Sequence, residues 1–406
     1  MIAKLKEYAK LLIQSGLNVQ KGQTVVISSP VETAYFARLC TSSAYELGAK
    51  EVVVQWYDDF INREKYLHAS EEVFDEYPNH LVEFNDYYAN MGAGFLKIYA
   101  SDPENLKGVN ADRIQRLNKI SGEKTEHFRQ MQMSNVIPWC VASVPVEAWA
   151  KKVFPNDEKA MDKLWDSILA TVRVSGNGDA IELWNEHTKK TYLRKEKLNE
   201  YNFKQLHYKN SLGTDLVVEL PLNHSWEGGT NTNSKGVKFS ANMPSEEIFT
   251  APNCNKINGK LVATMPLVMQ GNIIDGFSFE IKDGKIISVS AKQGKEILEN
   301  AISVDEGASY FGEIALVSKN SPIKKQGILF YNTLFDENAS CHFAFGKAYP
   351  CLKDAKSLTK EELKNRGIND SLTHIDFMVG SDDLSIIGTT HTGEEVAIFI
   401  DGDFAF

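Results

Sequence analysis

The sequence predicts two domains of different class: an α/β domain with a mostly parallel sheet over residues 1–200, followed by an α+β domain rich in antiparallel strands over residues 201–406. Two observations predict this division. In the first half, continuous apolar runs alternate with segments of helical length, which is the pattern of parallel strands buried on both faces. In the second half, short strand-like runs are separated by turn signals, which is typical of antiparallel hairpins.

The first half begins with an amphipathic helix over residues 1–17. Lys4, Lys6 and Lys10 fall between its apolar residues, so this segment lacks the uninterrupted apolar core of a signal peptide. The segments that follow read as strand, helix and strand, which together form a βαβ unit. They are residues 23–30, 31–49 and 50–59.

Two further strands are expected in the first half, at residues 94–101 and 136–146, each followed by helical periodicity. No Gly-x-Gly-x-x-Gly sequence follows the first strand, so the fingerprint of a nicotinamide dinucleotide site is missing. Residues 158–200 are strongly helical and highly charged. We interpret this segment as a solvated helix and connector, with a basic binding patch as the alternative.

The second half contains four groups of strand-like residues: 205–221, 260–271, 277–291 and 396–406. Glycine accepts a positive φ without steric cost, so Asp-Gly is a strong signal for a hairpin turn. Asp-Gly occurs at residues 275–276, 283–284 and 401–402.

Composition excludes several classes of protein. Lys and Arg number 44 and Asp and Glu number 54, which gives a formal charge of 44 − 54 = −10 and argues against a nucleic-acid partner. The five cysteines are odd in number and contain no Cys-x-x-Cys pair, so neither a disulfide framework nor a zinc knuckle is expected. No apolar run approaches the ~18 residues of a membrane span. We therefore expect a cytoplasmic protein with no membrane partner.

Residues 371–383 are the most informative segment. If residues 374–378 form a strand, His374, Asp376 and Met378 share one face, and the opposite face is apolar enough to pack in a core. A histidine and a carboxylate two residues apart suit a shared metal ion, or a histidine oriented by an aspartate. The alternative is a His–Asp pair on a half-exposed sheet.

Two other segments carry candidate groups with plain structural alternatives. His342 and Tyr349 are seven residues apart and would share a face if the stretch were helical, although His342 also suits a core position. Glu246 and Glu247 are adjacent, so in an extended backbone at most one of them faces a given site. The alternative for these two glutamates is a solvated acidic turn.

Glu313 interrupts a run that otherwise reads as buried, residues 310–317. A carboxylate in such a run costs several kcal/mol unless it is paired or coordinated, so either Glu313 is not buried or it has a bound cation. Three carboxylates and two imidazoles in the second domain are the ligand types of two-metal hydrolytic sites. Neither His-Glu-x-x-His nor Gly-x-Ser-x-Gly is present, which argues against zincins and typical serine hydrolases.

Four motifs, in this order and spacing, resemble the aminopeptidase T and aminopeptidase S (aminopeptidase II) family of dimetal metallo-aminopeptidases. They are NMPSEEIFTAP, the glutamate of SYFGEIALV, HFAFGKAY and THIDFMVGS. The resemblance spans the whole chain and implies a two-domain cytoplasmic exopeptidase, usually a homodimer whose active sites open into an enclosed cavity. It places the metal ligands on Glu247, Glu313, His342, His374 and Asp376, with Glu313 between the two ions, and the active-site tyrosine on Tyr349.

The resemblance implies an enzyme that removes the N-terminal residue from peptides with a free N-terminus by means of a metal-activated water. We expect two divalent ions per chain, zinc or cobalt first, with magnesium or manganese as alternatives. Tyr349 is the expected donor to the oxyanion, and Glu246 the candidate general base or amine anchor. His207, His224 and His391 are expected to be structural or solvent-facing. Two other functions remain open: another metal-dependent amide or ester hydrolase, and a non-catalytic two-domain binding protein.

Overall fold

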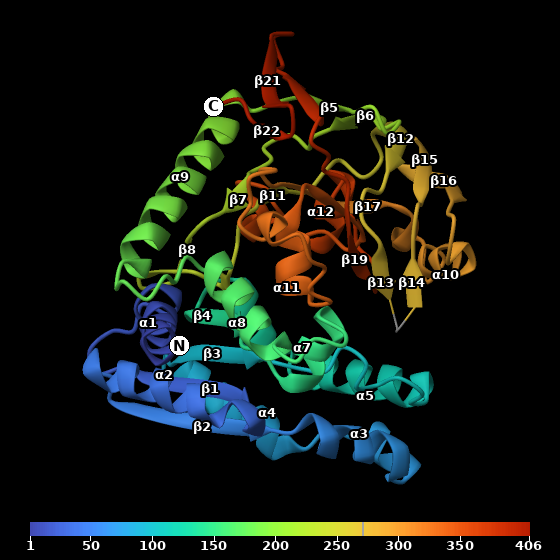
Figure 1. The fold of residues 1–406 in the computed structure, drawn as a ribbon. Helices are drawn as coiled ribbons and strands as arrows, with labels where there is room; N and C mark the ends of the chain where they lie inside the picture. The colour runs from blue at the N-terminus through green and yellow to red at the C-terminus, as the bar shows by residue number, and fades with distance from the viewer. Residues whose placement is uncertain (270–271) are drawn as a thin grey trace. The chain divides into compact units, whose positions relative to one another are not determined.

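The structure is a computed structural model that describes residues 1–269 and 272–406 (Figure 1). The chain forms two compact units, and each unit is assembled from two stretches of sequence. The ranges are Met1–His187 with Thr230–Pro244 for unit 1, and Thr188–Gly229 with Ser245–Phe406 for unit 2. By contacts, the chain passes from unit 1 to unit 2 within the long helix α9 (Ala180–Tyr201). The boundary at residue 200 rests on the change of sequence pattern and stays a prediction.

Unit 1 contains a five-stranded sheet with the order β10-β4-β3-β1-β2, and all of its pairings are parallel, which confirms the fold class expected for the first half. The last strand, β10, joins the sheet because Asn242 and Met243 pair with β4, so residues 230–244 belong to unit 1. The strands are β1 (Thr24–Pro30), β2 (Glu51–Tyr57), β3 (Gly94–Tyr99), β4 (Trp139–Ser143) and β10 (Asn242–Met243), with a separate hairpin of β8 (Asn231–Thr232) and β9 (Lys238–Phe239).

Helices cover both faces of this sheet. On one face, Val26 and Phe95 pack against aromatic residues of α4 and α6, including Phe84 and Phe128. On the other face, Tyr8 of α1 contacts Phe36 of α2 at 5.2 Å between ring centroids. Besides α9, the helices are α1 (Ile2–Leu11), α2 (Ala34–Glu46), α3 (Asp59–His68), α4 (Asn79–Asn90), α5 (Ala111–Lys124), α6 (Glu126–Met133), α7 (Glu147–Val153) and α8 (Ala160–Thr171).

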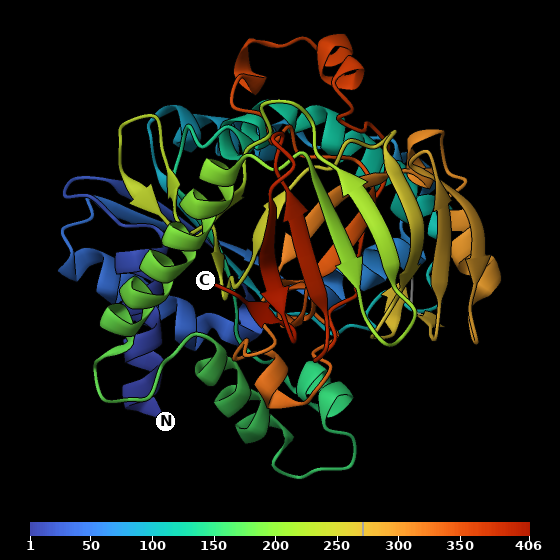
Figure 2. The ribbon, with the colours of Figure 1, turned by 90° about the horizontal axis from the view of Figure 1, so that it is seen from above.

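Unit 2 is built on two antiparallel sheets, as the second half of the sequence predicts. The larger sheet has the order β16-β15-β12-β6-β5-β20-β21-β22, and Figure 2 shows its strands side by side. Its strands are β5 (Gln205–Lys209), β6 (Asp215–Glu219), β12 (Ile257–Val262), β15 (Ser278–Lys282), β16 (Lys285–Ser290), β20 (Ser385–Thr389), β21 (Glu395–Ile400) and β22 (Asp403–Phe404).

The smaller sheet of unit 2 has the order β19-β18-β17-β11-β7. Its strands are β7 (Glu227–Gly228), β11 (Ile248–Thr250), β17 (Phe311–Leu316), β18 (His342–Gly346) and β19 (His374–Met378). A separate hairpin and three short helices complete the unit: β13 (Leu267–Met269), β14 (Asn272–Ile274), α10 (Lys295–Ala301), α11 (Thr333–Asp336) and α12 (Lys360–Asn365). The strand-like run expected at residues 260–271 contains the end of β12 (residues 260–262) and all of β13, and its last two residues lie outside the described part of the chain.

Two local expectations need correction. Residues 342–346 form strand β18, so the helical spacing considered for His342 and Tyr349 is wrong; Phe343 and Phe345 alternate with smaller residues and pack on one face, which is a strand pattern. Asp-Gly at 283–284 and 401–402 joins paired strands with positive φ at both residues, as predicted. Asp-Gly at 275–276 links β14 to β15 in different sheets, so the hairpin expected there is wrong.

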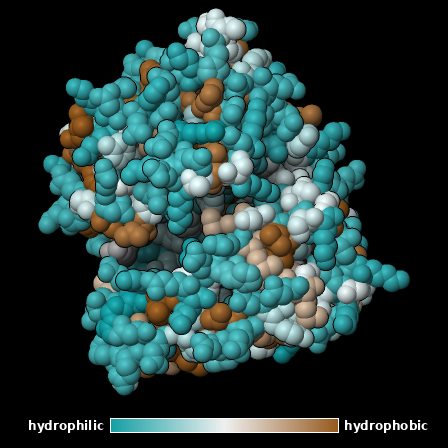
Figure 3. All heavy atoms as spheres, turned by 180° about the vertical axis from the view of Figure 1, so that it is seen from behind, coloured by the Kyte–Doolittle hydropathy of each residue, from teal (hydrophilic) through white to brown (hydrophobic). Residues whose placement is uncertain are grey.

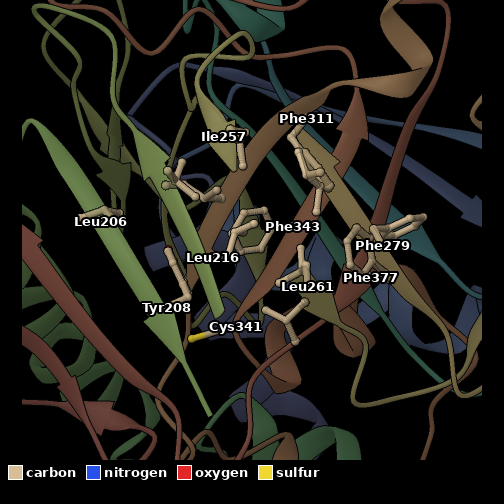
Figure 4. Packing of buried hydrophobic residues seen from close by; sticks show 14 of the residues in the cluster. Leu206, Tyr208, Leu216, Ile257, Leu261, Phe279, Phe311, Cys341, Phe343 and Phe377 are labelled. Carbon is tan, nitrogen blue, oxygen red and sulfur yellow. The ribbon is translucent and has the colours of Figure 1, made fainter. Parts of the chain in front are cut away.

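The core of unit 2 is rich in phenylalanine (Figure 4). Phe377 of β19 lies at its centre, with ring centroids 5.2 Å from Phe279 and 5.6 Å from Phe277. Phe311 and Phe345 each lie 6.2 Å from the same ring. One face of the smaller sheet is therefore committed to this core, and the other face is left to carry polar groups.

Polar residues dominate the surface seen in Figure 3, where apolar side chains occur in small scattered groups. In the described part of the chain, no helix combines the length and the apolar character needed to cross a membrane.

Truncation of the central phenylalanine tests this account of the core. Phe377→Ala should lower the free energy of unfolding by about 3–5 kcal/mol, because a buried ring is lost and the surrounding rings cannot collapse into its space. Urea denaturation measures the change. Ile287→Ala, at a position that is 61% exposed, is the matched control and should change stability by no more than about 0.5 kcal/mol. Equal effects of the two substitutions would contradict the central role of Phe377.

Candidate metal centre

The polar face of the smaller sheet in unit 2 brings the candidate residues together. Glu313 of β17, Ala344 of β18 and Asp376 of β19 are directly paired across three strands. His342 is paired with Ala315 on the neighbouring strand. Because directly paired residues project from the same face, these acidic and imidazole side chains rise beside small alanines that leave space between them.

A β-bulge sets the direction of Glu313. The register between β17 and β18 shifts between Phe311 and Glu313, so Phe311 faces the core whereas Glu313 faces the opposite side. Without the extra residue, side chains two positions apart would share a face. Gly312 suits the bulge because a Cβ atom there would lie 2.4 Å from the carbonyl oxygen of Lys347.

Two groups of donor atoms share Glu313. In the first group, His342 Nε2 lies 3.2 Å from Glu247 Oε2 and 3.5 Å from Glu313 Oε1. In the second group, His374 Nε2 lies 3.4 Å from Asp376 Oδ1 and 4.0 Å from Glu313 Oε2. Within each group the donor atoms lie within 4.8 Å of one another. Each oxygen of Glu313 therefore serves a different group.

Both histidines present Nε2 to the carboxylates because backbone carbonyls hold the other ring nitrogen. His342 Nδ1 donates to the carbonyl oxygen of Ser340 at 3.1 Å, and His374 Nδ1 donates to that of Lys347 at 2.7 Å. This arrangement fixes the tautomer in which Nε2 carries the lone pair of a metal ligand. The five residues that the sequence predicts as ligands, Glu247, Glu313, His342, His374 and Asp376, all lie in these two groups.

The carboxylates in these groups raise the pKa values of both histidines. Burial alone would lower the pKa of His342, but its hydrogen bonds with Glu247 and Glu313 outweigh burial and raise the pKa well above the ordinary value. Burial would also lower the pKa of His374. The interaction with Asp376 and the charge of Glu313 outweigh burial, and the pKa rises to about 9. Without metal, the imidazoles therefore carry protons that balance the carboxylates.

The carboxylates respond in opposite directions. Burial raises the pKa of Glu313, and the charges of Asp376 and Glu247 raise it further, although His342 acts against them. Burial would also raise the pKa of Asp376, but its interaction with His374 lowers it overall. His374 Nε2 faces Asp376 Oδ1 at 3.4 Å as an ion pair, and this buried oxygen accepts no hydrogen bond of ordinary geometry from the described residues. A buried, acidic cluster with an unsatisfied oxygen is chemically suited to divalent cations.

One further acidic residue of this centre was missed by the sequence reasoning. Burial raises the pKa of Glu337 well above its ordinary value, and the charges of Glu247 and Asp376 add to the effect. Glu337 begins a short 3-10 turn after α11, in the polar stretch Asp336–Glu337–Asn338. A glutamate among polar residues gives no sign of burial in the sequence, so only the tertiary structure reveals it.

Tyr349 lies beside the second group of donors, on the loop that follows β18. Its ring centroid lies 6.1 Å from that of His374 and 6.0 Å from that of Phe249. Burial, followed by the charges of Glu313 and Glu337, raises the pKa of Tyr349 to about 12. The phenol therefore keeps its proton at neutral pH and can donate a hydrogen bond.

Glu246 is directed differently from its neighbour Glu247. Its backbone N–H donates to Asn338 Oδ1 at 2.7 Å. Its charge acts on Arg194, where burial lowers the pKa of the guanidinium and the charges of Asp403 and Glu246 oppose that shift. Glu247 belongs to the first group of donors, whereas Glu246 belongs to neither group.

The three histidines expected to be structural lie outside both groups of donors. His207 Nε2 lies 2.6 Å from Asp215 Oδ1, between neighbouring strands of the larger sheet. His224 is buried, and its Nδ1 donates to the carbonyl oxygen of Pro221 at 3.1 Å. Burial lowers the pKa of His224 to about 4.

Comparison with known proteins gives one consistent result. Residues 1–404 match the family described as thermophilic metalloprotease (M29). The chain is 43% identical to aminopeptidase 2 of Geobacillus stearothermophilus, over 99% of this chain and 98% of that protein. It is 34% identical to aminopeptidase T of Thermus thermophilus, over 96% and 95% of the two chains.

Solved structures resemble the chain at two levels. Wild-type AmpT from Thermus thermophilus aligns with a TM-score of 0.92 at 33% identity, over 99% of both chains. A 2,5-dihydroxypyridine dioxygenase from Pseudomonas putida KT2440 aligns with a TM-score of 0.52 at 12% identity, over 100% of this chain and 96% of that one. The second likeness shows the fold alone.

Proton release on metal binding tests the electrostatics of the centre. Since the pKa of His374 is about 9 and that of His342 is also raised, both imidazoles must lose a proton before Nε2 can coordinate, so zinc affinity should rise with pH, by up to about tenfold per pH unit for each proton released. Calorimetry of the metal-free protein in two buffers of different ionisation enthalpy measures the protons released. His391→Asn, outside the donor groups, should release as many protons as the unaltered protein.

The raised pKa of His374 also makes the stability of the metal-free protein depend on pH. The pKa of His374 is raised above its unfolded value of about 6.5, so its contribution to stability is complete below pH 6.5 and is lost as the pH rises through 9.

Zinc affinity independent of pH between 6 and 9 would contradict the expected release of protons on metal binding.

Proposed function

The chain belongs to the M29 family of metallopeptidases and is a hydrolase of the metallo-exopeptidase class; we propose that it releases the N-terminal residue of peptides at a centre of two divalent ions. The family resemblance that the sequence motifs predict is confirmed by these comparisons. The two-metal proposal is supported by the two carboxylate oxygens of Glu313, because Oε1 lies in the first group of donors and Oε2 lies in the second.

In this proposal, Glu247 and His342 hold one ion, His374 and Asp376 hold the other, and Glu313 lies between them. Imidazole nitrogen and carboxylate oxygen suit zinc or cobalt, with manganese or magnesium as alternatives. Two ions of charge +2 with three carboxylates would leave a formal charge of about 4 − 3 = +1 on the ligand set. When bound, such ions lower the pKa of water from about 15.7 towards 7 and polarise a carbonyl.

The chain's own residues supply the remaining chemistry. Tyr349 Oη donates a hydrogen bond to the carbonyl oxygen as it gains negative charge, and loss of such a donor costs about 2.7–4 kcal/mol of transition-state stabilisation. Burial and the charges of Glu247 and Asp376 raise the pKa of Glu337, which allows it to hold a proton beside the ligands. We keep Glu246 as a candidate anchor for the free amine or as a general base. The restriction to the first residue follows from the need to bind a free α-amine.

Two further parts of the proposal come from the family resemblance: assembly as a homodimer and a cytoplasmic location. Another metal-dependent amide or ester hydrolase would use the same donors, and substrate assays distinguish that alternative. The non-catalytic binding protein considered from the sequence is excluded by membership of the metallopeptidase family.

Chelation and blocked substrates test the proposed activity. Treatment with a chelator should abolish release of the first residue from a peptide, and zinc or cobalt should restore it, because the ligands remain in place. The N-acetylated form of the same peptide should not be cleaved, since it has no free amine. Chromatography of the products measures both results. Equal hydrolysis of free and acetylated peptides would exclude an aminopeptidase.

Matched glutamine variants test the roles of the acidic residues. Glu313→Gln should lower kcat/KM by roughly a hundredfold or more and reduce the metal content, because it removes the carboxylate common to both groups. The proposed role of Glu246 predicts that Glu246→Gln lowers turnover and changes its pH dependence while both ions stay bound. Metal analysis and pH-rate profiles separate the two cases. Full turnover of Glu246→Gln with an unchanged pH profile would remove Glu246 from the mechanism.

A further inference from the structure

The row of residues that contains His342 continues across the smaller sheet to an exposed carboxylate. Direct pairing links His342 to Ala315, Ala315 to Phe249, and Phe249 to Glu227 on the edge strand β7. Residues paired in this way project from one face, so Glu227 rises on the same side of the sheet as the donors. Neighbouring strands lie ≈ 4.8 Å apart, which places the Glu227 and His342 backbones roughly 14 Å from each other.

The residues between the donors and Glu227 are small or aromatic. Ala315 lies beside His342, and Phe249 follows it on β11. The ring of Phe249 is half-buried and lies 6.0 Å from that of Tyr349. Ala315 is buried, and Phe249 packs on one side against the buried cluster that contains Cys351 and Leu352. The exposed part of the Phe249 ring is therefore what can contact an aliphatic stem, as long cationic side chains require when only their heads are hydrated.

Cys351 shows that Glu227 is electrostatically linked to the metal centre. Burial raises the pKa of the Cys351 thiol, and the charges of Glu227 and Glu313 are the next two causes. Both carboxylates therefore lie close enough to act on one buried atom. Glu227 is nevertheless too far along the row to join the donor groups, which do not include it.

Glu227 is exposed and has no cationic partner among the described residues. Its Oε1 accepts a hydrogen bond from Ser225 Oγ at 3.1 Å, which orients the carboxylate. Within residues 1–269 and 272–406, no lysine, arginine or histidine forms an ion pair with it. As an exposed carboxylate, Glu227 can form a charge-assisted hydrogen bond with a cation supplied from outside the chain.

We propose that Glu227 selects the side chain of the substrate's N-terminal residue and favours arginine and lysine. This inference rests on the proposed aminopeptidase function. The α-amine is bonded to the same carbon as the reacting carbonyl group, so it stays near the donors and cannot reach β7. The distal end of a long side chain can, with its stem along Phe249 and its guanidinium or ammonium group at Glu227.

Substrate selectivity tests the proposal in the metal-loaded enzyme. For Glu227→Gln, kcat/KM should fall roughly three- to tenfold with arginyl and lysyl p-nitroanilides, the range for a partly solvated, charge-assisted pair, and by less than about twofold with the leucyl substrate. Salt should reduce the arginyl-to-leucyl ratio in the unaltered enzyme, because it screens the pair. Glu395→Gln, an exposed glutamate on β21 of the larger sheet, is the matched control and should leave the ratio unchanged.

A charge reversal gives a second readout that a purely structural role would not produce. Glu227→Lys should lower the arginyl-to-leucyl ratio of kcat/KM further than Glu227→Gln does. It should raise the glutamyl-to-leucyl ratio of kcat/KM. An unchanged arginyl-to-leucyl ratio in Glu227→Gln, or an equal loss with all substrates, would overturn the role of Glu227 while leaving the aminopeptidase function intact. If the unaltered, metal-loaded enzyme cleaved none of these substrates, the proposed function itself would fail.

Discussion

A carboxylate on a fully buried strand is the constraint on which the rest of the centre depends. Every residue of β17 is buried, and Glu313 is the acidic one among them. Burial of an unpaired carboxylate costs several kcal/mol, so the fold must supply positive charge at this point. His342 and His374 supply it as protons when metal is absent, and the donor set suits divalent ions in their place. The bulge at Gly312, the backbone acceptors of the two imidazoles and the alanines beside them all serve this requirement.

The smaller sheet joins stability to function because its two faces have separate tasks. Phe311, Phe343 and Phe377 anchor one face in the aromatic core, and the donors project from the other. Adjacent side chains alternate between these faces, so packing of the core fixes the backbone that positions each ligand. The same register extends to Glu227 at the edge strand, which connects the chemistry of the donors to the selection of substrate.

Much of this arrangement could be predicted from the sequence, and the failures have physical causes. Alternation at residues 374–378 and the isolated carboxylate at Glu313 marked candidate positions, because strand period and burial cost are local signals, and the family resemblance supplied the full ligand set. The strand at His342 was obscured by Gly346 and Pro350, which break both helical and strand patterns. Glu337 and the pairing of β10 with β4 depend on contacts between distant segments, and neither leaves a local signal. Two of the three Asp-Gly turns were hairpins, because dipeptide chemistry fixes a turn but not the partner of the next strand.

Anomalous X-ray diffraction from crystals loaded with zinc tests the central claim most directly. Two anomalous peaks are predicted per chain, one coordinated by each oxygen of Glu313 at about 2.0–2.2 Å, with Glu247 and His342 at one ion and His374 and Asp376 at the other. A single peak, or two peaks of which one lies away from Glu313, would contradict the account.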